Sequence, residues 1–250
     1  MFLDDLVAFA RGHGVVVDEA VVLRDRSNLL VHLTPAPVVA RIPAVTAIVR
    51  SDAAVNLARE IDVTDWLAAA GAAVVGASPE LPPGVHSIAG RPVSFRRFVA
   101  HHGAATADAV AVASAVCALH EALLDCPIRL PLLSPITSDL GAAIDALGST
   151  HDVAEVRGAH NTFVAELGAA VAGVPQQVLH GDCHRRNLLV TETGLVWNDF
   201  EDTCRGPLEW DLAVMDLADR SPLAELMRAG RSLQSRVWST LFDRHSGSPS

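Results

Sequence analysis

The chain has 250 residues, enough for one large domain or for two small lobes that share a buried core. Half of the residues are hydrophobic, which excludes a disordered or fibrous protein. The net charge of −10 argues against broad binding of nucleic acid through neutralised phosphates. It suits a cationic substrate, or an anionic substrate whose charge metal ions mask. Lysine is absent, so any task usually given to lysine must fall to arginine.

The cysteines and the N-terminus bear on the cellular compartment. Cys117, Cys126, Cys183 and Cys204 form no C-x-x-C pair, so reduced thiols are expected. The first residues carry acids where a signal peptide needs bases. No stretch approaches the roughly 20 apolar residues of a membrane span. We therefore expect a cytoplasmic protein with no membrane partner.

The first hundred residues predict a small antiparallel sheet. Residues 3–12 have the apolar spacing of a short amphipathic helix that ends at glycines. Residues 15–43 are rich in β-branched side chains and predict two or three strands, with turns near residues 25–28 and 34–37. This half therefore begins as a helix followed by a meander of strands.

One main helix and a further hairpin complete the first half. Ser51 or Asp52 can cap a long helix that runs through Ala70. Residues 81–100 predict a hairpin that turns at Ala89–Gly90.

The second half is mostly helical. Alanine-rich helical patterns cover residues 104–124, 136–148 and 152–173. Short strands follow between residues 177 and 201, and the C-terminus returns to helix. A sheet lobe followed by a helical lobe is a two-lobed α+β plan, which we divide into residues 1–98 and 99–250 with a hinge near 95–100.

Residues 178–190, VLHGDCHRRNLLV, hold four possible metal ligands within five positions. Closed zinc sites usually draw their ligands in spaced pairs from two elements. Here His180, Asp182, Cys183 and His184 lie too close in sequence to converge without strain, and no matching pair follows. A transition-metal hydrolase is therefore the less favoured interpretation.

A second interpretation takes Asp182 and Asn187 as a unit, at the two ends of a loop that leads into a strand. Asp199 follows on an adjacent hairpin. In a phosphoryl-transfer site, the first carboxylate accepts a proton from the attacking hydroxyl. The amide oxygen and the second carboxylate offer the oxygen ligands that Mg²⁺ prefers.

Three motifs in order, HGDCHRRN, WNDFED and EWDLA, resemble the aminoglycoside phosphotransferase and choline kinase family, a relative of the protein kinases. The resemblance implies a two-lobed protein-kinase-like fold. It also implies transfer of the γ-phosphate of ATP or GTP to a hydroxyl of a small molecule.

The resemblance assigns roles to single residues. Asp182 would be the catalytic base, and Asn187 and Asp199 would bind Mg²⁺. His180 would be structural, and Asp211 would brace the loop through backbone hydrogen bonds. His184, two positions after Asp182, would either donate to the γ-phosphate or be structural.

The N-terminal half should then bind the nucleotide, through a basic residue on a strand paired with a carboxylate on the next helix. Arg41 stands where the family has lysine, and Glu60 lies 19 residues further on in the long helix. Arginine can hold α- and β-phosphate oxygens, although its planar geometry differs from that of an ammonium. The alternative is an exposed arginine at a strand end.

The remaining nucleotide contacts are predicted from position. A glycine-rich phosphate loop is missing, so Ser27 and Asn28 in the turn RDRSNLL are the candidates, although ordinary turn formation explains them equally well. Backbone groups of Arg97 and Val99 in the hinge would bind adenine.

The sequence leaves the acceptor open between an aminoglycoside, another antibiotic, an amino alcohol, a sugar and an amino acid. Acids near the motifs could attract a cationic acceptor, although a solvated helix face explains them as well. These acids are Glu201, Asp202, Glu209, Asp216 and Asp219. A nucleotide-binding pseudokinase without turnover is the alternative function, because Arg41 replaces lysine and the C-terminal part is short.

Overall fold

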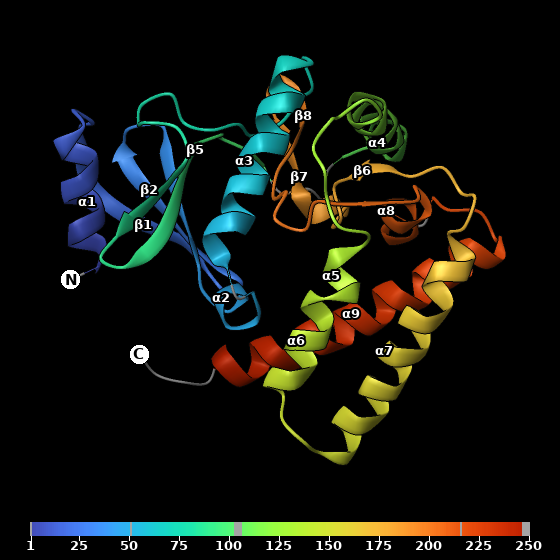
Figure 1. Ribbon diagram of the computed structural model, residues 1–250. Coiled ribbons are helices and arrows are strands. Elements are labelled where there is room, and N and C mark those ends of the chain that lie inside the picture. Colours follow the sequence, from blue (N-terminus) through green and yellow to red (C-terminus); the bar gives the residue numbers. More distant parts are fainter. Residues whose placement is uncertain (1, 51, 103–106, 216, 247–250) are drawn as a thin grey trace.

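The computed structural model describes residues 2–50, 52–102, 107–215 and 217–246 (Figure 1). An antiparallel sheet with its helices forms the N-terminal lobe, and a mostly helical lobe follows, as the sequence predicts. None of the helices in these ranges is long and apolar enough to cross a membrane.

The N-terminal sheet has the strand order β1-β2-β3-β5-β4, and all its neighbours are antiparallel. The strands are β1 (Val17–Asp25), β2 (Asn28–Pro35), β3 (Val38–Pro43), β4 (Val85–Ile88) and β5 (Arg91–Arg97). The predicted turns near 25–28, 34–37 and 89–90 are confirmed. Ala89 and Gly90 both have positive φ, the backbone conformation that tight hairpin turns require.

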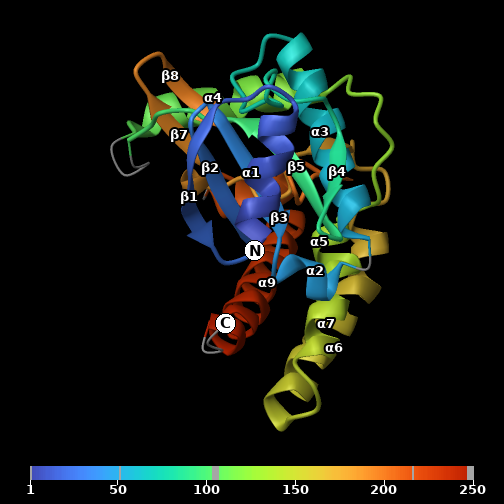
Figure 2. The same ribbon diagram turned by 90° about the vertical axis from the view of Figure 1, so that its left-hand side faces the viewer.

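One face of this sheet packs against α1 (Phe2–Gly12), as Figure 2 shows. Leu6 and Ala10 of α1 are fully buried in a cluster with Val31, Leu33 and other strand residues. The amphipathic spacing of the first helix therefore serves to cover the sheet.

The opposite face meets α3 (Ala53–Ala69), the predicted main helix. Asp52 caps it by accepting a hydrogen bond from the Val55 backbone N–H (3.1 Å), while Ser51, the other predicted cap, lies outside the described residues. The short helix α2 (Thr46–Val49) precedes it and was not predicted.

The C-terminal lobe is built from α4 (Ala109–Leu123), α5 (Ser134–Thr137), α6 (Asp139–Ala146), α7 (His151–Ala170), α8 (Glu209–Val214) and α9 (Pro222–Ser246). Helices α5, α6, α7 and α9 pack around one apolar cluster. The sequence predicts a helix from residue 104, but residues 103–106 lie outside the described ranges, and Asp108 caps α4 by accepting from the Ala111 N–H.

Two small sheets frame the predicted site. Strand β6 (Gln177–Leu179) pairs with β9 (Cys204–Gly206), and β7 (Leu188–Thr191) pairs with β8 (Gly194–Trp197). The 180–187 loop connects β6 to β7 and ends in a 3₁₀ turn, Arg185–Asn187. These pairings bring the loop beside the segment from Asn198 to Asp202.

Candidate active site

The 180–187 loop is held from below by Asp211, the buried aspartate of EWDLA. Its two carboxylate oxygens accept the backbone N–H groups of His180 and Gly181, each at 2.9 Å. His120 of α4 lies within hydrogen-bond distance of the same carboxylate (3.1 Å). The predicted brace is therefore present, and it fixes the backbone immediately before Asp182.

Gly181 makes this tight arrangement possible. Its φ is +84°, and a Cβ at this position would lie 1.8 Å from the Asp202 carbonyl oxygen. Its own carbonyl accepts the Trp210 indole N–H (3.0 Å) and Arg231 Nη1 (2.8 Å). Only glycine fits between the two backbone segments.

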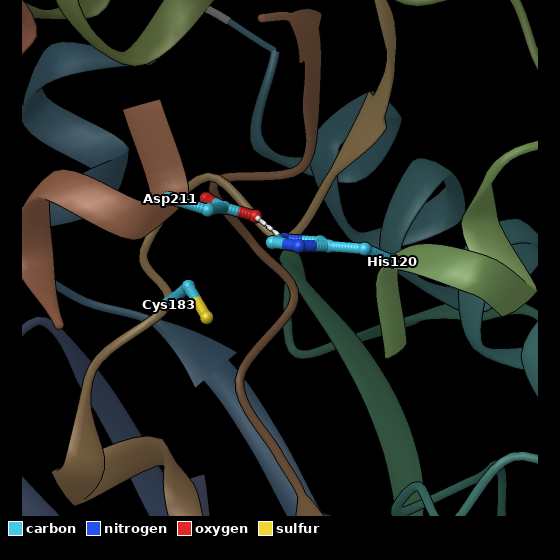
Figure 3. A group of neighbouring side chains, drawn as sticks. All are labelled: His120, Cys183 and Asp211. Atoms are coloured by element: carbon cyan, nitrogen blue, oxygen red, sulfur yellow. Dashed lines mark hydrogen bonds and ion pairs between the residues drawn. The ribbon is translucent and has the colours of Figure 1, made fainter. Parts of the chain in front are cut away.

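Figure 3 shows His120, Cys183 and Asp211. Among the described residues, this is the one group of His, Cys, Asp or Glu side chains whose possible ligand atoms all lie within 4.8 Å of one another. It differs from the cluster considered in the sequence, since only Cys183 is common to both. Burial raises the pKa of the Cys183 thiol, and Asp211 already accepts hydrogen bonds on both oxygens. His120 and Asp211 of this group therefore brace the loop.

Asp182 lines a cavity, and its carboxylate contacts three side chains. Arg231 of α9 pairs with one carboxylate oxygen. His184 Nε2 (3.2 Å) and Asn187 Nδ2 (3.3 Å) approach the other. Burial alone would raise the pKa of Asp182, but the His184 hydrogen bond and the Arg231 charge lower it well below its usual range. Burial would lower the pKa of His184, but the hydrogen bond to Asp182 and the charge of that carboxylate raise it.

Asn187, at the end of the 3₁₀ turn before β7, and Asp199, two residues after β8, both reach the same cavity. Asn187 Nδ2 also donates to the Asp182 carbonyl (2.9 Å), and the Asn187 carbonyl accepts the Asn198 N–H (2.9 Å). The Asn198 carbonyl lies 3.1 Å from His180 Nε2. Asp199 has a φ of +68°, so its side chain leaves the hairpin in an unusual direction. Backbone contacts thus fix both residues relative to Asp182.

Arg41 is buried, with 3% of its surface exposed, so the alternative of an exposed arginine is wrong. Its Nε lies 3.4 Å from Glu60 Oε2, the predicted pairing. Its Nη2 also reaches Asp199 Oδ1 (2.6 Å) and Glu201 Oε2 (3.0 Å). Although burial opposes it, the three carboxylates raise the pKa of Arg41, which stays charged.

Arg96 is a partner that the sequence prediction missed. Its guanidinium lies 3.1 Å from Glu60 Oε2 and donates to the Thr64 hydroxyl (2.8 Å). Alternation along β5 turns Arg96 inward and leaves Arg97 exposed. The alternating strand pattern could have identified it, because Arg96 and Arg41 stand on neighbouring paired strands with Val39 and Ser94 as their partners.

Arg50 is the second missed cation. It is buried after α2 and pairs with Asp202, with Asp139 (2.8 Å) and with Glu201 (3.2 Å). Nothing around Arg50 in the sequence signals this role, because its three partners lie 89 to 152 positions away. Two of the acids that the sequence offered for a cationic acceptor, Glu201 and Asp202, are therefore engaged by arginines of the protein.

Together these residues form a connected charge network. Its members are the cations Arg41, Arg50 and Arg96 and the acids Glu60, Asp139, Asp199, Glu201 and Asp202. Five carboxylates against three guanidiniums leave two negative charges uncompensated. Burial, with the neighbouring acids, raises the pKa of Asp202 to about 7 despite Arg50. The network therefore favours an additional cation or proton.

The cavity itself has a volume of about 950 Å³ and lies between the β1–β2 turn, the 180–187 loop and α9. Asp182, His184, Asn187, Asp199 and Ser27 all line it. The structure thus brings five of the predicted residues to one space.

Other predicted residues lie outside the lining of this cavity. Asn28 is buried and its Nδ2 donates to Glu201 (2.9 Å), while its side-chain Oδ1 accepts from the Thr46 hydroxyl. The Arg97 backbone N–H donates to the Gly76 carbonyl (3.1 Å). The Val99 carbonyl lies 2.9 Å from His101 Nδ1. These backbone groups therefore already have partners within the protein.

Of the remaining acids from the sequence, Glu209 and Asp219 lie outside the lining of the cavity. Asp219 is exposed and accepts the Ser221 backbone N–H (2.9 Å). Glu209 begins α8 and is half-buried, and Asp216 lies outside the described residues.

The sequence profile of the family described as "Phosphotransferase enzyme family" matches residues 20–241. The chain belongs to this family. The match includes the 180–187 loop, the Asp199 hairpin and most of α9, so all the residues that line the cavity except Phe242 and Asp243 lie within the matched region. A search of curated proteins gives no match to this chain.

Several solved structures have a fold similar to that of this chain. The chain is similar to the aminoglycoside-3'-phosphotransferase of type VIII, at 20% identity and a TM-score of 0.60, covering 100% of this chain and 94% of that one. It is also similar to choline kinase LicA from Streptococcus pneumoniae, at 14% identity and a TM-score of 0.66, covering 100% and 94%. A third similar structure is the aminoglycoside phosphotransferase APH(3'')-Id from Streptomyces rimosus in complex with ADP and streptomycin. The identity is 15% and the TM-score is 0.60, and the match covers 96% of this chain and 97% of that one. The kinase-like fold is therefore established.

Proposed function

We propose that this protein transfers the γ-phosphoryl group of ATP or GTP to a hydroxyl group of a small molecule. The observation that carries the proposal is the convergence of Asp182, Asn187 and Asp199 on one large cavity. These are the three residue types that phosphoryl transfer from a metal-bound nucleotide requires. Structural relatives with ADP and streptomycin, or with GDP and kanamycin, support a nucleotide donor and a small acceptor.

Asp182 is proposed as the catalytic base. Its carboxylate orients the acceptor hydroxyl and takes its proton as the new oxygen–phosphorus bond forms. The bond between the γ-phosphorus and the bridging oxygen breaks, and the nucleoside diphosphate leaves. The fixed backbone of the 180–187 loop holds this carboxylate in place, so positioning supplies much of the rate.

The donor set fits Mg²⁺. Asn187 uses its amide nitrogen on Asp182, which leaves the amide oxygen as its ligand atom. Asp199 has a second carboxylate oxygen beside the one that accepts from Arg41. Both are hard oxygen ligands, and the charge network carries an excess of two negative charges. A bound Mg²⁺ would neutralise negative charge on the transferring phosphoryl group.

Contacts with the nucleotide are proposed for residues that line the cavity or pair with its lining. Arg41 lies behind the cavity lining and pairs with Asp199, which is part of it. Held by Glu60, Arg41 is proposed to contact α- and β-phosphate oxygens, with Ser27 of the β1–β2 turn in the lining. His184 is proposed to donate to the γ-phosphate, because the contact with Asp182 favours its protonated form. For Arg97 and Val99 the proposal of a contact with adenine rests on chain position alone.

Two measurements test the proposal. Thermal shifts with ATP and with GTP, each with and without Mg²⁺, report nucleotide binding, and diphosphate release with a panel of hydroxyl acceptors reports transfer. We expect Asp182→Asn to lower turnover about 10²–10⁴-fold while nucleotide still binds. Asp125→Asn, an exposed acid outside the cavity, is the matched control. Nucleotide stabilisation without turnover on any acceptor would favour the pseudokinase instead.

A further inference from the structure

Helix α9 provides one complete wall of the cavity. We call Arg231, Ser232, Ser235, Trp238, Ser239 and Phe242 the α9 wall; Arg228, Gln234 and Asp243 of the same helix also line the cavity. The spacing of the α9 wall residues places them along one face of the helix. The three serine side chains are exposed to the cavity, and the rings of Trp238 and Phe242 stack with centroids 5.5 Å apart. Hydroxyl groups beside an aromatic face suit a ligand with many hydroxyl groups and apolar C–H surfaces.

Arg231 is the member of the α9 wall nearest to the chemistry. Its Nη1 donates to the Gly181 carbonyl (2.8 Å) and to Gln234 Oε1 (2.7 Å), and its guanidinium lies 5.1 Å from the Trp210 ring centroid. Its Nη2 pairs with Asp182. A permanent positive charge is therefore fixed beside the base, where the acceptor hydroxyl must bind.

Four of the acids that line the cavity each lie against an arginine of the protein. Asp182 is paired with Arg231, and the network acids Asp199, Glu201 and Asp202 are paired with Arg41 or Arg50. These four carboxylates thus already face cations of the protein.

The arginines around the same cavity are less engaged. Arg24, Arg26 and Arg186 also line it, are exposed, and pair with no acid among the residues that the structure describes. Asp243 is the one exposed acid of the lining, but it stands twelve residues beyond Arg231. At about 1.5 Å per residue this is roughly 18 Å along the helix, too far for a small amino alcohol to join it to Asp182.

From this arrangement we infer that the acceptor is a polyhydroxylated small molecule carrying an anionic group, a carboxylate or a phosphate, that Arg231 binds beside the accepting hydroxyl. The carbon skeleton lies along the α9 wall, against Trp238 and the serine hydroxyls. When the anionic group takes the guanidinium, the contact of Arg231 with Asp182 weakens and the carboxylate is free to orient the hydroxyl. An amine in the same position would instead meet a like charge. This inference rests on the proposed phosphoryl transfer and gives it a substrate class.

The test uses acceptors that differ in charge on one skeleton. Glucosamine, glucose, glucuronate and glucose 6-phosphate form one series; serinol, glycerol, glycerate and glycerol 3-phosphate form the other. Diphosphate release with Mg-ATP gives kcat/KM, and thermal shifts with a non-hydrolysable ATP analogue give binding. We expect at least one anion to exceed its cationic counterpart at least tenfold in kcat/KM. The better anion distinguishes a carboxylate from a phosphate.

Substitutions of Arg231 should change the preference between anionic and cationic acceptors, which a loss of folded protein would not do. In Arg231→Gln the preference for the anion should fall at least tenfold, mainly through KM, and in Arg231→Glu the order of the cationic and anionic members should reverse. Arg236→Gln, on the exposed side of the same helix and outside the cavity, should keep the wild-type preference.

The outcomes separate this inference from the proposed function. Transfer to the cationic member, with the anions no better in turnover or in thermal shift, would overturn the inference and leave the phosphotransferase standing. The same holds if Asp182-dependent hydrolysis of ATP occurs without any preference for the anions. If Mg-ATP neither binds nor is hydrolysed, the proposed function fails and the inference fails with it.

Discussion

The 180–187 loop and the charge network both border the cavity but are stabilised in different ways. The loop is held by backbone N–H and carbonyl groups that bond to Asp211 and Trp210 in a dry interior. The network is held by side-chain ion pairs of Arg41 and Arg50, and its charges do not balance. Backbone hydrogen bonds fix one geometry, whereas an unbalanced set of long side chains can adjust when ligands bind. The loop therefore sets the position of the base, and the network adapts to the nucleotide and its metal.

The largest effect on the loop is expected from Gly181→Ala. The added methyl group collides with the Asp202 backbone, and the positive φ adds strain, so a loss of about 4 kcal/mol or more in unfolding free energy is expected. Gly71→Ala is the matched control, because Gly71 has a similar φ of +78° with open space around it. It should cost only about 1–2 kcal/mol. Equal costs in urea unfolding would show that the close approach does not constrain the loop.

Asp211→Asn tests the brace itself. The amide nitrogen would face the N–H groups that Asp211 now accepts, and each donor left unsatisfied should cost about 1–3 kcal/mol. The measurement is urea unfolding together with turnover, since a displaced loop also misplaces Asp182. Asp145→Asn removes an exposed ion pair with Arg157 and should cost less than about 1 kcal/mol. If Asp211→Asn lowered the unfolding free energy no more than Asp145→Asn does, the loop would not be held by the Asp211 hydrogen bonds.

Arg41→Lys tests how far the network adapts. Lysine keeps the charge but cannot contact Glu60, Asp199 and Glu201 together. Because the network is adjustable, we expect Mg-ATP to bind within about tenfold of wild type, which is about 1.4 kcal/mol. Calorimetry measures this, with Arg129→Lys, an exposed arginine outside the cavity, as the control. A loss of a hundredfold or more would show that the network is as rigid as the loop.

The last expected effect is a pH dependence of stability from Asp202. Its pKa is raised by burial to about 7 in the folded protein, so between about pH 4 and pH 7 the folded state holds a proton that the unfolded state has released. This term therefore lowers stability as the pH rises, by at most about 1.4 kcal/mol per unit, and is constant above that range. Asp202→Asn should flatten the decline in urea unfolding between pH 5 and pH 8. Parallel curves would place the pKa of Asp202 near its ordinary value.

Much of the site follows from local sequence. Asp182, Asn187 and Asp199 lie within 18 positions, on a loop and a hairpin whose turn residues and apolar strands are visible in the sequence, and the structure brings them to one cavity. Arg41 and Glu60 were also paired correctly, because a strand and the following helix must pack together. The sequence prediction missed three arginines that join segments far apart in the chain: Arg50, Arg96 and Arg231.

The sequence by itself determined the two-lobed plan, the order of most elements and the three residues proposed for phosphoryl transfer, because hydrophobic period, turn residues and motif spacing act over short distances. The tertiary structure alone decided the short strand β9, the charge network and the character of the acceptor wall. These depend on which charges are buried beside each other and on which face of α9 meets the cavity. Neighbours in the sequence do not fix either property, since a buried charge is stabilised by whichever partner the fold brings to it.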